Sequence, residues 1–263
     1  MNGLSNVNVF ENMIDLALSL GGPLRLIVLA ALIGGCSTTR TWSPAVTLPF
    51  ESLAPVSVSA MSAELEFDAI ADGQRLKLDG VWVSEGPDRF RLELRAPTGG
   101  VVFSVATNGQ EITCYDARAA LFFQGEATPR SFDLLLPMAP LALEGTQWLA
   151  LLLGAFHPPT DALYEQADDR SVRARFKQGA NEVEALFGSD TFLQTLRILG
   201  AEGAVEVTYG KRDADGRSLE TLIEDSEGKH RMRMRLRDIR RVETFPDKVF
   251  KIRLPQGVEQ IAL

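Results

Sequence analysis

Apolar and polar residues alternate along most of the chain from residue 57 onward, and this alternation predicts short β-strands. Residues 89–95 show it clearly, because Phe90, Leu92 and Leu94 share one face while charged residues share the other. Turn signals separate such runs, and Asn108-Gly109 is typical of a two-residue hairpin turn. The strands expected in the first half are 57–70, 75–84, 89–95, 101–107, 111–116 and 120–124.

The pattern changes to helical spacing in the middle of the chain. A short apolar segment, 132–136, ends at Pro137, and a second segment, 144–153, ends at Gly154. The second segment contains Trp148 and is more apolar than an ordinary one-sided helix. Two interpretations stay open for it: the helix packs in a filled core, or it lies inside or over an apolar cavity.

Strands return after the helical segments, and the alternation continues to residue 242. The expected strands are 171–176, 182–187, 192–199, 204–209, 217–224 and 230–242. The whole pattern predicts a mainly β domain of about ten or eleven antiparallel strands with a helical insertion. Residues 245–250, which follow, are expected to add an edge strand.

An apolar segment near the N-terminus is too short to cross a bilayer. Residues 26–33 are wholly apolar, whereas a spanning helix needs roughly 20 such residues. With Arg25 before it, the segment is typical of a secretory signal. Residues 33–36 then read Ile-Gly-Gly-Cys, which resembles the bacterial lipobox, where the thiol of the cysteine receives a diacylglyceryl group. The alternative is an ordinary signal peptide followed by an unrelated cysteine.

These features divide the chain into a lipoprotein signal peptide (1–35), a lipidated tether (36–55) and a folded domain (56–263). Met13 is an alternative start, because it leaves a signal of ordinary length. Cys36 is the predicted lipidation site. The other cysteine, Cys114, lies in an expected strand, so we expect a buried structural thiol and no disulfide within the mature chain.

Composition narrows the possible functions of the 263-residue chain. Its net charge is −8, from 27 Lys and Arg against 35 Asp and Glu, which argues against a general nucleic-acid-binding protein. Only two His and two Cys are present, which argues against metal sites and His-dependent catalysis. No Gly-x-Ser-x-Gly, phosphate-loop or His-Glu-x-x-His motif occurs. We therefore expect neither an enzyme nor a bound cofactor or metal.

The order of these elements resembles the LolA/LolB superfamily of bacterial lipoprotein carriers, and in particular the outer-membrane lipoprotein LolB. Residues 88–99 are similar to the third strand of LolB and its following loop, and residues 137–141 to its Pro-rich turn. Trp148 stands where LolB has a Trp-containing helix. Residues 160–164 and 222–238 are similar to a later polar group and to the last hairpin. The resemblance implies an open antiparallel β half-barrel whose helices cover an apolar cavity.

Such a cavity would suit acyl chains, because apolar burial is non-directional and scales with area. Its expected lining comes from one face of the early strands, from the Trp148 helix and from the late Met-rich strand. The candidate lining residues are Leu65, Phe67, Phe90, Leu92, Leu94, Phe103, Trp148, Leu152, Met232, Met234 and Leu236. A filled core without a cavity is the alternative.

The resemblance also implies a membrane-insertion loop at Pro97, Thr98 and Gly99. LolB carries a protruding leucine on this loop that is important for delivering lipoproteins into the membrane, and Thr98 is the matching residue here. A small polar residue inserts poorly into acyl chains. The loop therefore favours a carrier or binding role over a complete LolB role.

Arginines alternate with Met and Leu in residues 231–241, which invites two interpretations. The basic face could attract anionic lipid headgroups. Alternatively, the arginines form ordinary cross-strand pairs with the preceding strand. In a tight hairpin Glu224 would face Arg231, and Glu220 would face Arg235.

The expected protein is thus a monomeric lipoprotein on the periplasmic face of the bacterial outer membrane. It would bind and transfer acyl chains of lipids or lipoproteins, acting as a chaperone in lipoprotein localisation and protein transport. The expected partners are the membrane, reached through a lipid anchor such as palmitate, the acyl chains themselves and a periplasmic LolA-like donor, but no nucleic acid. The alternative is a non-catalytic lipoprotein scaffold or assembly factor of an envelope complex.

Overall fold

The computed structural model describes residues 60–71, 73–135, 143, 145–168, 171–201 and 203–262, with the backbone alone at 133–135. The predicted signal peptide, Cys36 and the tether lie outside the described residues, as does the predicted Pro-rich turn at 137–141. Within the described part of the chain, no helix has the length and apolar character needed to cross a membrane.

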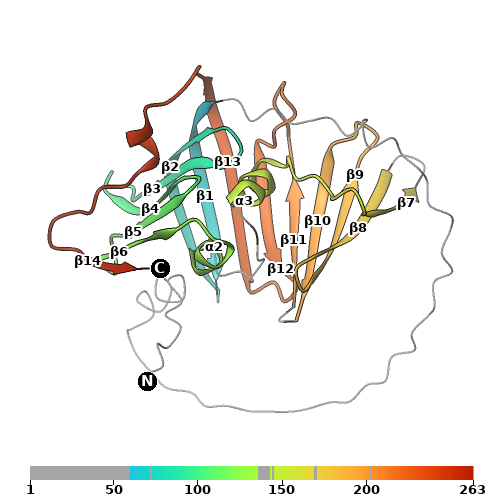
Figure 1. Cartoon of the computed structure of the whole chain (residues 1–263), viewed down its shortest axis with the longest axis horizontal. Coiled ribbons are helices and arrows are strands. Elements are labelled where there is room, and N and C mark those ends of the chain that lie inside the picture. The colour runs from blue at the N-terminus through green and yellow to red at the C-terminus, as the bar shows by residue number, and fades with distance from the viewer. Residues whose placement is uncertain are drawn as a thin grey trace, which may run out of the picture.

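One sheet contains the fourteen described strands, in the order β14-β6-β5-β4-β3-β2-β1-β13-β12-β11-β10-β9-β8-β7. Neighbouring strands are antiparallel except for β14, which runs parallel to β6. The described strands β14 and β7 end the order without pairing with each other, so the sheet stays open and does not close into a barrel. This confirms the predicted mainly β, open antiparallel architecture (Figure 1).

The number of strands was underestimated from the sequence. The prediction was about ten or eleven strands, and fourteen are described. No expected range covered two of them: β7, which is mostly polar, and β14, a four-residue edge strand. The first group of strands is β1 (Met61–Ala71), β2 (Gln74–Glu85), β3 (Arg89–Arg95), β4 (Val101–Asn108), β5 (Glu111–Asp116) and β6 (Leu121–Glu126). The second group is β7 (Leu163–Asp168), β8 (Ser171–Gln178), β9 (Asn181–Phe187), β10 (Leu193–Gly200), β11 (Gly203–Tyr209), β12 (Glu220–Asp225), β13 (His230–Arg241) and β14 (Glu259–Ala262).

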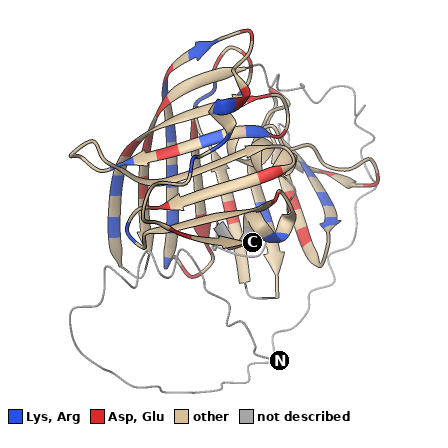
Figure 2. Ribbon diagram, turned by 60° about the vertical axis from the view of Figure 1, so that its left-hand side comes forward, with Lys and Arg blue, Asp and Glu red and all other residues tan. Residues whose placement is uncertain are grey.

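Burial alternates along the strands and gives the sheet two different faces. On β1 the odd residues from Met61 to Ala71 are buried, while Glu64, Glu66 and Asp68 point to the other side. We name the buried side the concave face and the other the convex face. Figure 2 shows the acidic and basic residues distributed along the strands of the sheet. This is the pattern of an antiparallel sheet with one packed side and one side in water.

Two helices lie within the curve of the sheet, on its concave side (Figure 1). They are α2 (Pro129–Leu135) and α3 (Gly145–Leu153), and they confirm the predicted helical insertion. The hydroxyl of Thr221 donates to the carbonyl of Leu152 at 2.8 Å, and the amide of Ser218 donates to the carbonyl of Leu153 at 2.8 Å. The C-terminal end of α3 is thereby fixed beside β12.

Charged residues on β12 and β13 pair across the strands. Glu224 faces Arg231 and Glu220 faces Arg235 in the observed register, which confirms the cross-strand pairing deduced from the hairpin. Arg231 approaches Glu224 at 3.1 Å, and Arg233 approaches Glu220 at 2.7 Å. The arginine row is therefore matched by carboxylates.

After β13 the chain crosses the convex face as a segment that we name the C-terminal strap, residues 243–258. The sequence predicted an edge strand at 245–250, and this is wrong: the segment contains a short 3-10 helix, η2 (Asp247–Phe250). The edge strand comes later, where β14 pairs with β6. Pro246 before η2 cannot donate to a strand ladder, which accounts for the difference.

The side chain of Arg217 holds the loop before β12 through ion pairs, and replacing this residue tests that role. Its side chain is 1% exposed and pairs with Asp213, at 2.9 Å, and with Asp215. Replacing Arg217 by Met should lower the free energy of unfolding by about 3 kcal/mol, because Asp213 loses its ion-pair partner. Asp215 keeps a second partner in Arg241, at 2.7 Å. Urea unfolding would measure this.

The matched control is Arg231→Gln, since the Arg231 side chain is 42% exposed in its ion pair with Glu224. Its loss should cost less than about 1 kcal/mol. Equal costs for the two variants would contradict the stabilising role given to the buried pair.

Candidate functional site

The concave face carries one continuous hydrophobic cluster that runs from β1 through both halves of the sheet and includes α3. Alternate residues of neighbouring strands meet there in register, as Phe67 does with Leu78 and with Met234. The aromatic rings of Trp82 and Phe90 stack with centroids 5.6 Å apart. All eleven predicted lining residues are buried and belong to this cluster: Leu65, Phe67, Phe90, Leu92, Leu94, Phe103, Trp148, Leu152, Met232, Met234 and Leu236.

Helix α3 packs against this cluster with nearly all of its apolar side chains. Trp148, Leu149 and residues 151–153 are all buried. Among the described residues the concave face is thus a packed apolar surface under α3, and the cavity predicted there is not shown. Two buried polar atoms of this region, Nε1 of Trp148 and the hydroxyl of Tyr209, have no hydrogen-bond partner among the described residues. Burial raises the pKa of Tyr209, so this hydroxyl stays protonated.

Cys114 lies in the same cluster and is fully buried. Burial, with a contribution from the nearby Asp116 carboxylate, raises its pKa well above the usual value for a thiol. A thiol held in its protonated form is a poor nucleophile. This agrees with the structural cysteine expected from the sequence.

The described residues contain no group of three or more His, Cys, Asp or Glu side chains that could hold a metal ion. His157, one of the two histidines, lies in the loop after α3, and burial lowers its pKa. His230 instead pairs with Asp225, with 2.6 Å between Nδ1 and the carboxylate.

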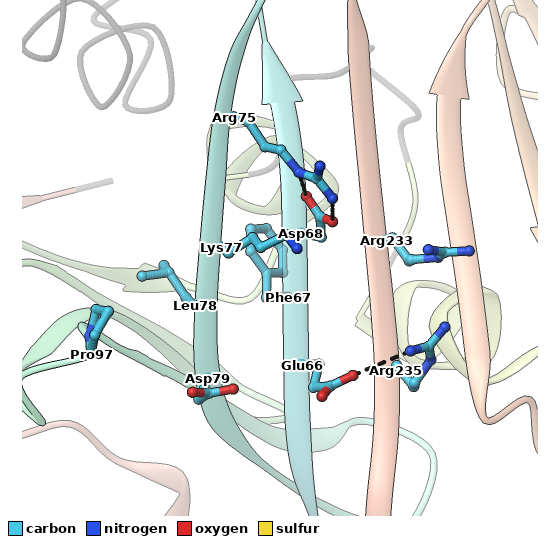
Figure 3. Close-up of a pocket in the computed structure, with 10 residues that line it drawn as sticks. All are labelled: Glu66, Phe67, Asp68, Arg75, Lys77, Leu78, Asp79, Pro97, Arg233 and Arg235. Carbon is cyan, nitrogen blue, oxygen red and sulfur yellow. Dashed lines mark hydrogen bonds and ion pairs between the residues drawn. The ribbon is translucent and has the colours of Figure 1, made fainter.

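A first pocket, of about 390 Å³, lies on the convex face over β2, β1 and β13. Figure 3 shows two pairs of opposite charge among its lining residues, Arg75 with Asp68 and Arg235 with Glu66. Arg75 donates to Asp68, with 2.8 Å from Nε to Oδ1, and Arg235 approaches Glu66 at 3.4 Å. The hydrogen bond with Arg75 is the main cause of the lowered pKa of Asp68. The pocket is therefore lined by four cations and three carboxylates, and Arg233 pairs with Glu220 outside it, at 2.7 Å.

A second pocket, of about 600 Å³, lies between the convex face and the C-terminal strap, and we name it the strap pocket. Strands β2 to β5 form the floor of this pocket, and the strap forms the opposite wall. The floor contributes Val81, Val83, Arg91, Glu93, Arg95, Val101, Ser104 and Tyr115, and the strap contributes Lys248, Val249, Lys251, Ile252 and Arg253. Sequence analysis missed this pocket, because no local pattern indicates that the strap folds back over these strands.

Side-chain contacts at several points hold the strap in place. Glu85 accepts hydrogen bonds from the Thr244 hydroxyl at 2.6 Å and the Phe245 amide at 3.1 Å. Arg89 pairs with Asp247 at 2.7 Å, and its guanidinium lies 4.3 Å from the centroid of the Phe250 ring. Phe250 itself is 1% exposed, so the strap also has a small apolar core on the convex face.

The predicted insertion loop is an exposed turn between β3 and β4. Pro97, Thr98 and Gly99 are all exposed, and the turn is closed by a 2.8 Å hydrogen bond from the Gly99 amide to the Ala96 carbonyl. Gly99 has a φ of +90°, which favours glycine over other residues. The loop is thus available for contact with another surface.

Comparison with solved structures identifies similar folds. A LolA superfamily protein from Nitrosomonas europaea is 11% identical, with a TM-score of 0.51, over 77% of this chain and 94% of that one. A DUF1329 family protein from Desulfovibrio piger is 10% identical, with a TM-score of 0.50, over 77% of this chain and 92% of that one. No family model and no curated protein sequence matches the chain. At these identities the likeness shows only that the fold is similar to that of these two proteins.

The Glu93 carboxylate in the strap pocket gives a prediction about pH. Burial opposes its ionisation, but hydrogen bonds from Arg95 and Arg91 outweigh that effect and lower its pKa. A lowered pKa in the folded state stabilises the fold above the unfolded pKa of about 4.3, and the stabilisation is lost as the pH falls through the folded value. Glu93→Gln should therefore be about 2 kcal/mol less stable than the wild type at pH 7.

This difference should shrink progressively once the pH falls below about 4.3. Urea unfolding of both proteins at a series of pH values would measure it. A stability difference that stays constant down to the lowest pH would show that ionised Glu93 is not its source.

Proposed function

We propose that this protein binds acyl chains of lipids or lipoproteins on its concave face and transfers them at the periplasmic side of the bacterial outer membrane. The observation that carries the proposal is the concave cluster: an open sheet of the LolA superfamily fold offers an apolar face that α3 covers. Burial of an acyl chain against such a face contributes about 25 cal/mol per Å² and needs no directional contacts.

Binding requires α3 to move or rearrange, because its leucines are buried in the concave cluster. The hydrogen bonds from Thr221 and Ser218 hold the last residues of the helix, and the Gln178 side chain donates to that of Gln147 in its first turn at 3.3 Å. Met232 and Met234 lie in the cluster below, and methionine side chains adapt readily to a new apolar neighbour. The buried Nε1 of Trp148 would gain a partner in an ester or amide carbonyl of a bound acyl group.

Anchoring at Cys36 belongs to the same proposal. A diacylglyceryl group on this residue would hold the protein at the membrane. A LolA-like periplasmic carrier would then be the donor, and the membrane the acceptor.

The first test is native mass spectrometry of the fragment that begins at Ser37, purified from a bacterial periplasm. We expect co-purified phospholipid or acylated peptide, and loss of this ligand in Trp148→Asp, because a carboxylate cannot stay ionised in the apolar cluster. The control is Leu163→Asp, which places the same charge at a position that is 51% exposed. Circular dichroism checks that each variant is folded.

A wild-type fragment that stays free of ligand after incubation with lipid and with a loaded LolA-like carrier would contradict the proposal. It would favour the alternative, a lipoprotein scaffold with the same fold that holds a partner protein of an envelope complex.

The insertion loop gives a separate prediction about transfer. Thr98→Leu should speed the transfer of a fluorescent fatty acid from the protein to acceptor vesicles by about threefold to tenfold, since each buried CH₂ contributes about 0.8 kcal/mol. Thr98 is exposed, so the fold should not change. Thr98→Ser is the control. Equal transfer by the leucine and serine variants would exclude a membrane role for this loop.

A further inference from the structure

The strap pocket differs from the rest of the convex face in its balance of charge. Over β12 and β13 the arginines have carboxylates beside them, as Arg231 has Glu224 and Arg237 has Glu66. The strap pocket is lined by five cationic side chains and a single carboxylate, Glu93. A chain with a net charge of −8 therefore carries a concentrated positive site.

Contacts within the pocket leave much of this charge unmatched. Arg91 and Arg95 share Glu93, each with a nitrogen 2.7 Å from one of its oxygens. Lys251 approaches Glu111 at 3.3 Å.

On the strap side, Lys248 and Arg253 also line the pocket. Neither has an ion-pair partner within the described ranges. With Glu111 included, the pocket keeps an excess of three positive charges.

Ser104 is an independent sign of a ligand. It lies on β4 between Glu93 and Tyr115 of the neighbouring strands and lines the pocket. The residue is 1% exposed, and its hydroxyl has no hydrogen-bond partner among the described residues. Buried hydroxyls are nearly always partnered, so this one is positioned for an acceptor that enters the pocket.

The rest of the lining is apolar. Val81 and Val83 contribute from β2, and Ile252 contributes from the strap. A volume of about 600 Å³ falls in the range of small-molecule sites. Cations beside an apolar floor match a molecule that has an anionic head and a short apolar portion.

We propose that the strap pocket binds a phosphate group joined to an apolar chain, with Arg91, Arg95, Lys248 and Arg253 around the phosphate and Ser104 donating a hydrogen bond to it. Guanidinium groups form paired, charge-assisted hydrogen bonds with phosphate oxygens, and lysine adds a mobile point charge. The apolar chain lies against Val81, Val83 and Ile252. This site is on the opposite face from the concave cluster and does not depend on acyl-chain transfer there.

The test is isothermal titration calorimetry of the full chain in a nonionic detergent with two probes, hexyl phosphate and inorganic phosphate. The first variant is Lys248→Gln combined with Arg253→Gln, because both side chains are exposed and the fold does not depend on them. The dissociation constant for hexyl phosphate should rise by about tenfold. The matched control, Arg231→Gln with Arg237→Gln, removes two charges from the same face and should change it by less than about twofold.

Ser104→Ala separates ligand binding from a structural role. The variant removes a hydroxyl that has no hydrogen-bond partner among the residues that the structure describes, so the thermal midpoint should not fall. Affinity for hexyl phosphate should weaken by about fivefold, the usual effect of one lost hydrogen bond.

The outcomes decide between ligand sources and can overturn the proposal. Tight binding of hexyl phosphate with weak binding of inorganic phosphate supports a phospholipid or another amphiphile. Equal binding of both probes, lost in the strap variant, supports the phosphate site with a free phosphate ligand. Absence of binding, or an equal loss in the control variant, overturns the proposal. Trp148→Asp should bind hexyl phosphate as the wild type does, so failure of the acyl-chain proposal would not affect this result.

Discussion

An open antiparallel sheet has an apolar face that it cannot bury by itself, and this constraint shapes the whole molecule. Closure into a barrel would bury that face, but β7 and β14 stay apart among the described strands. Helix α3 supplies the cover instead, because Trp148 and its leucines are apolar on nearly every side. Its mostly apolar composition suits this buried position.

The convex face is constrained by charge, since dense rows of like charge would repel one another. Over β12 and β13 this repulsion is offset by opposite charges on neighbouring strands, and Glu220 pairs with both Arg233 and Arg235. Over β2 to β5 the C-terminal strap covers the face, and β14 covers the edge of β6. Without β14, the edge of β6 would be free to pair with another chain.

Much of the fold could be predicted from the sequence, because burial repeats every second residue. The alternation in Phe90, Leu92 and Leu94 correctly placed these side chains in the core. Asn108-Gly109 correctly marked the β4–β5 hairpin, and Gly109 has the positive φ of +90° that such a turn uses. Gly154, with a φ of +68°, likewise ends α3 where the sequence indicated.

The missed features depend on contacts between segments far apart in the chain. β7 has few apolar residues to indicate a strand, and its partner β8 determines its conformation. The strap is held by Glu85, Arg89 and Thr113. The sequence pattern of their own strands does not predict these contacts with a distant segment. How closely α3 approaches the sheet likewise depends on contacts between distant segments, which periodicity does not determine.

The geometry of a strand explains how one sheet can hold two unlike sites. On β3, Leu92 belongs to the concave cluster, while Arg91 and Glu93 on either side of it line the strap pocket. The two sites therefore share backbone but no side chains, and their chemistry differs: one is apolar throughout, and the other has excess positive charge. Since strand neighbours point in opposite directions, the sequence of each site can change without placing a foreign side chain in the other.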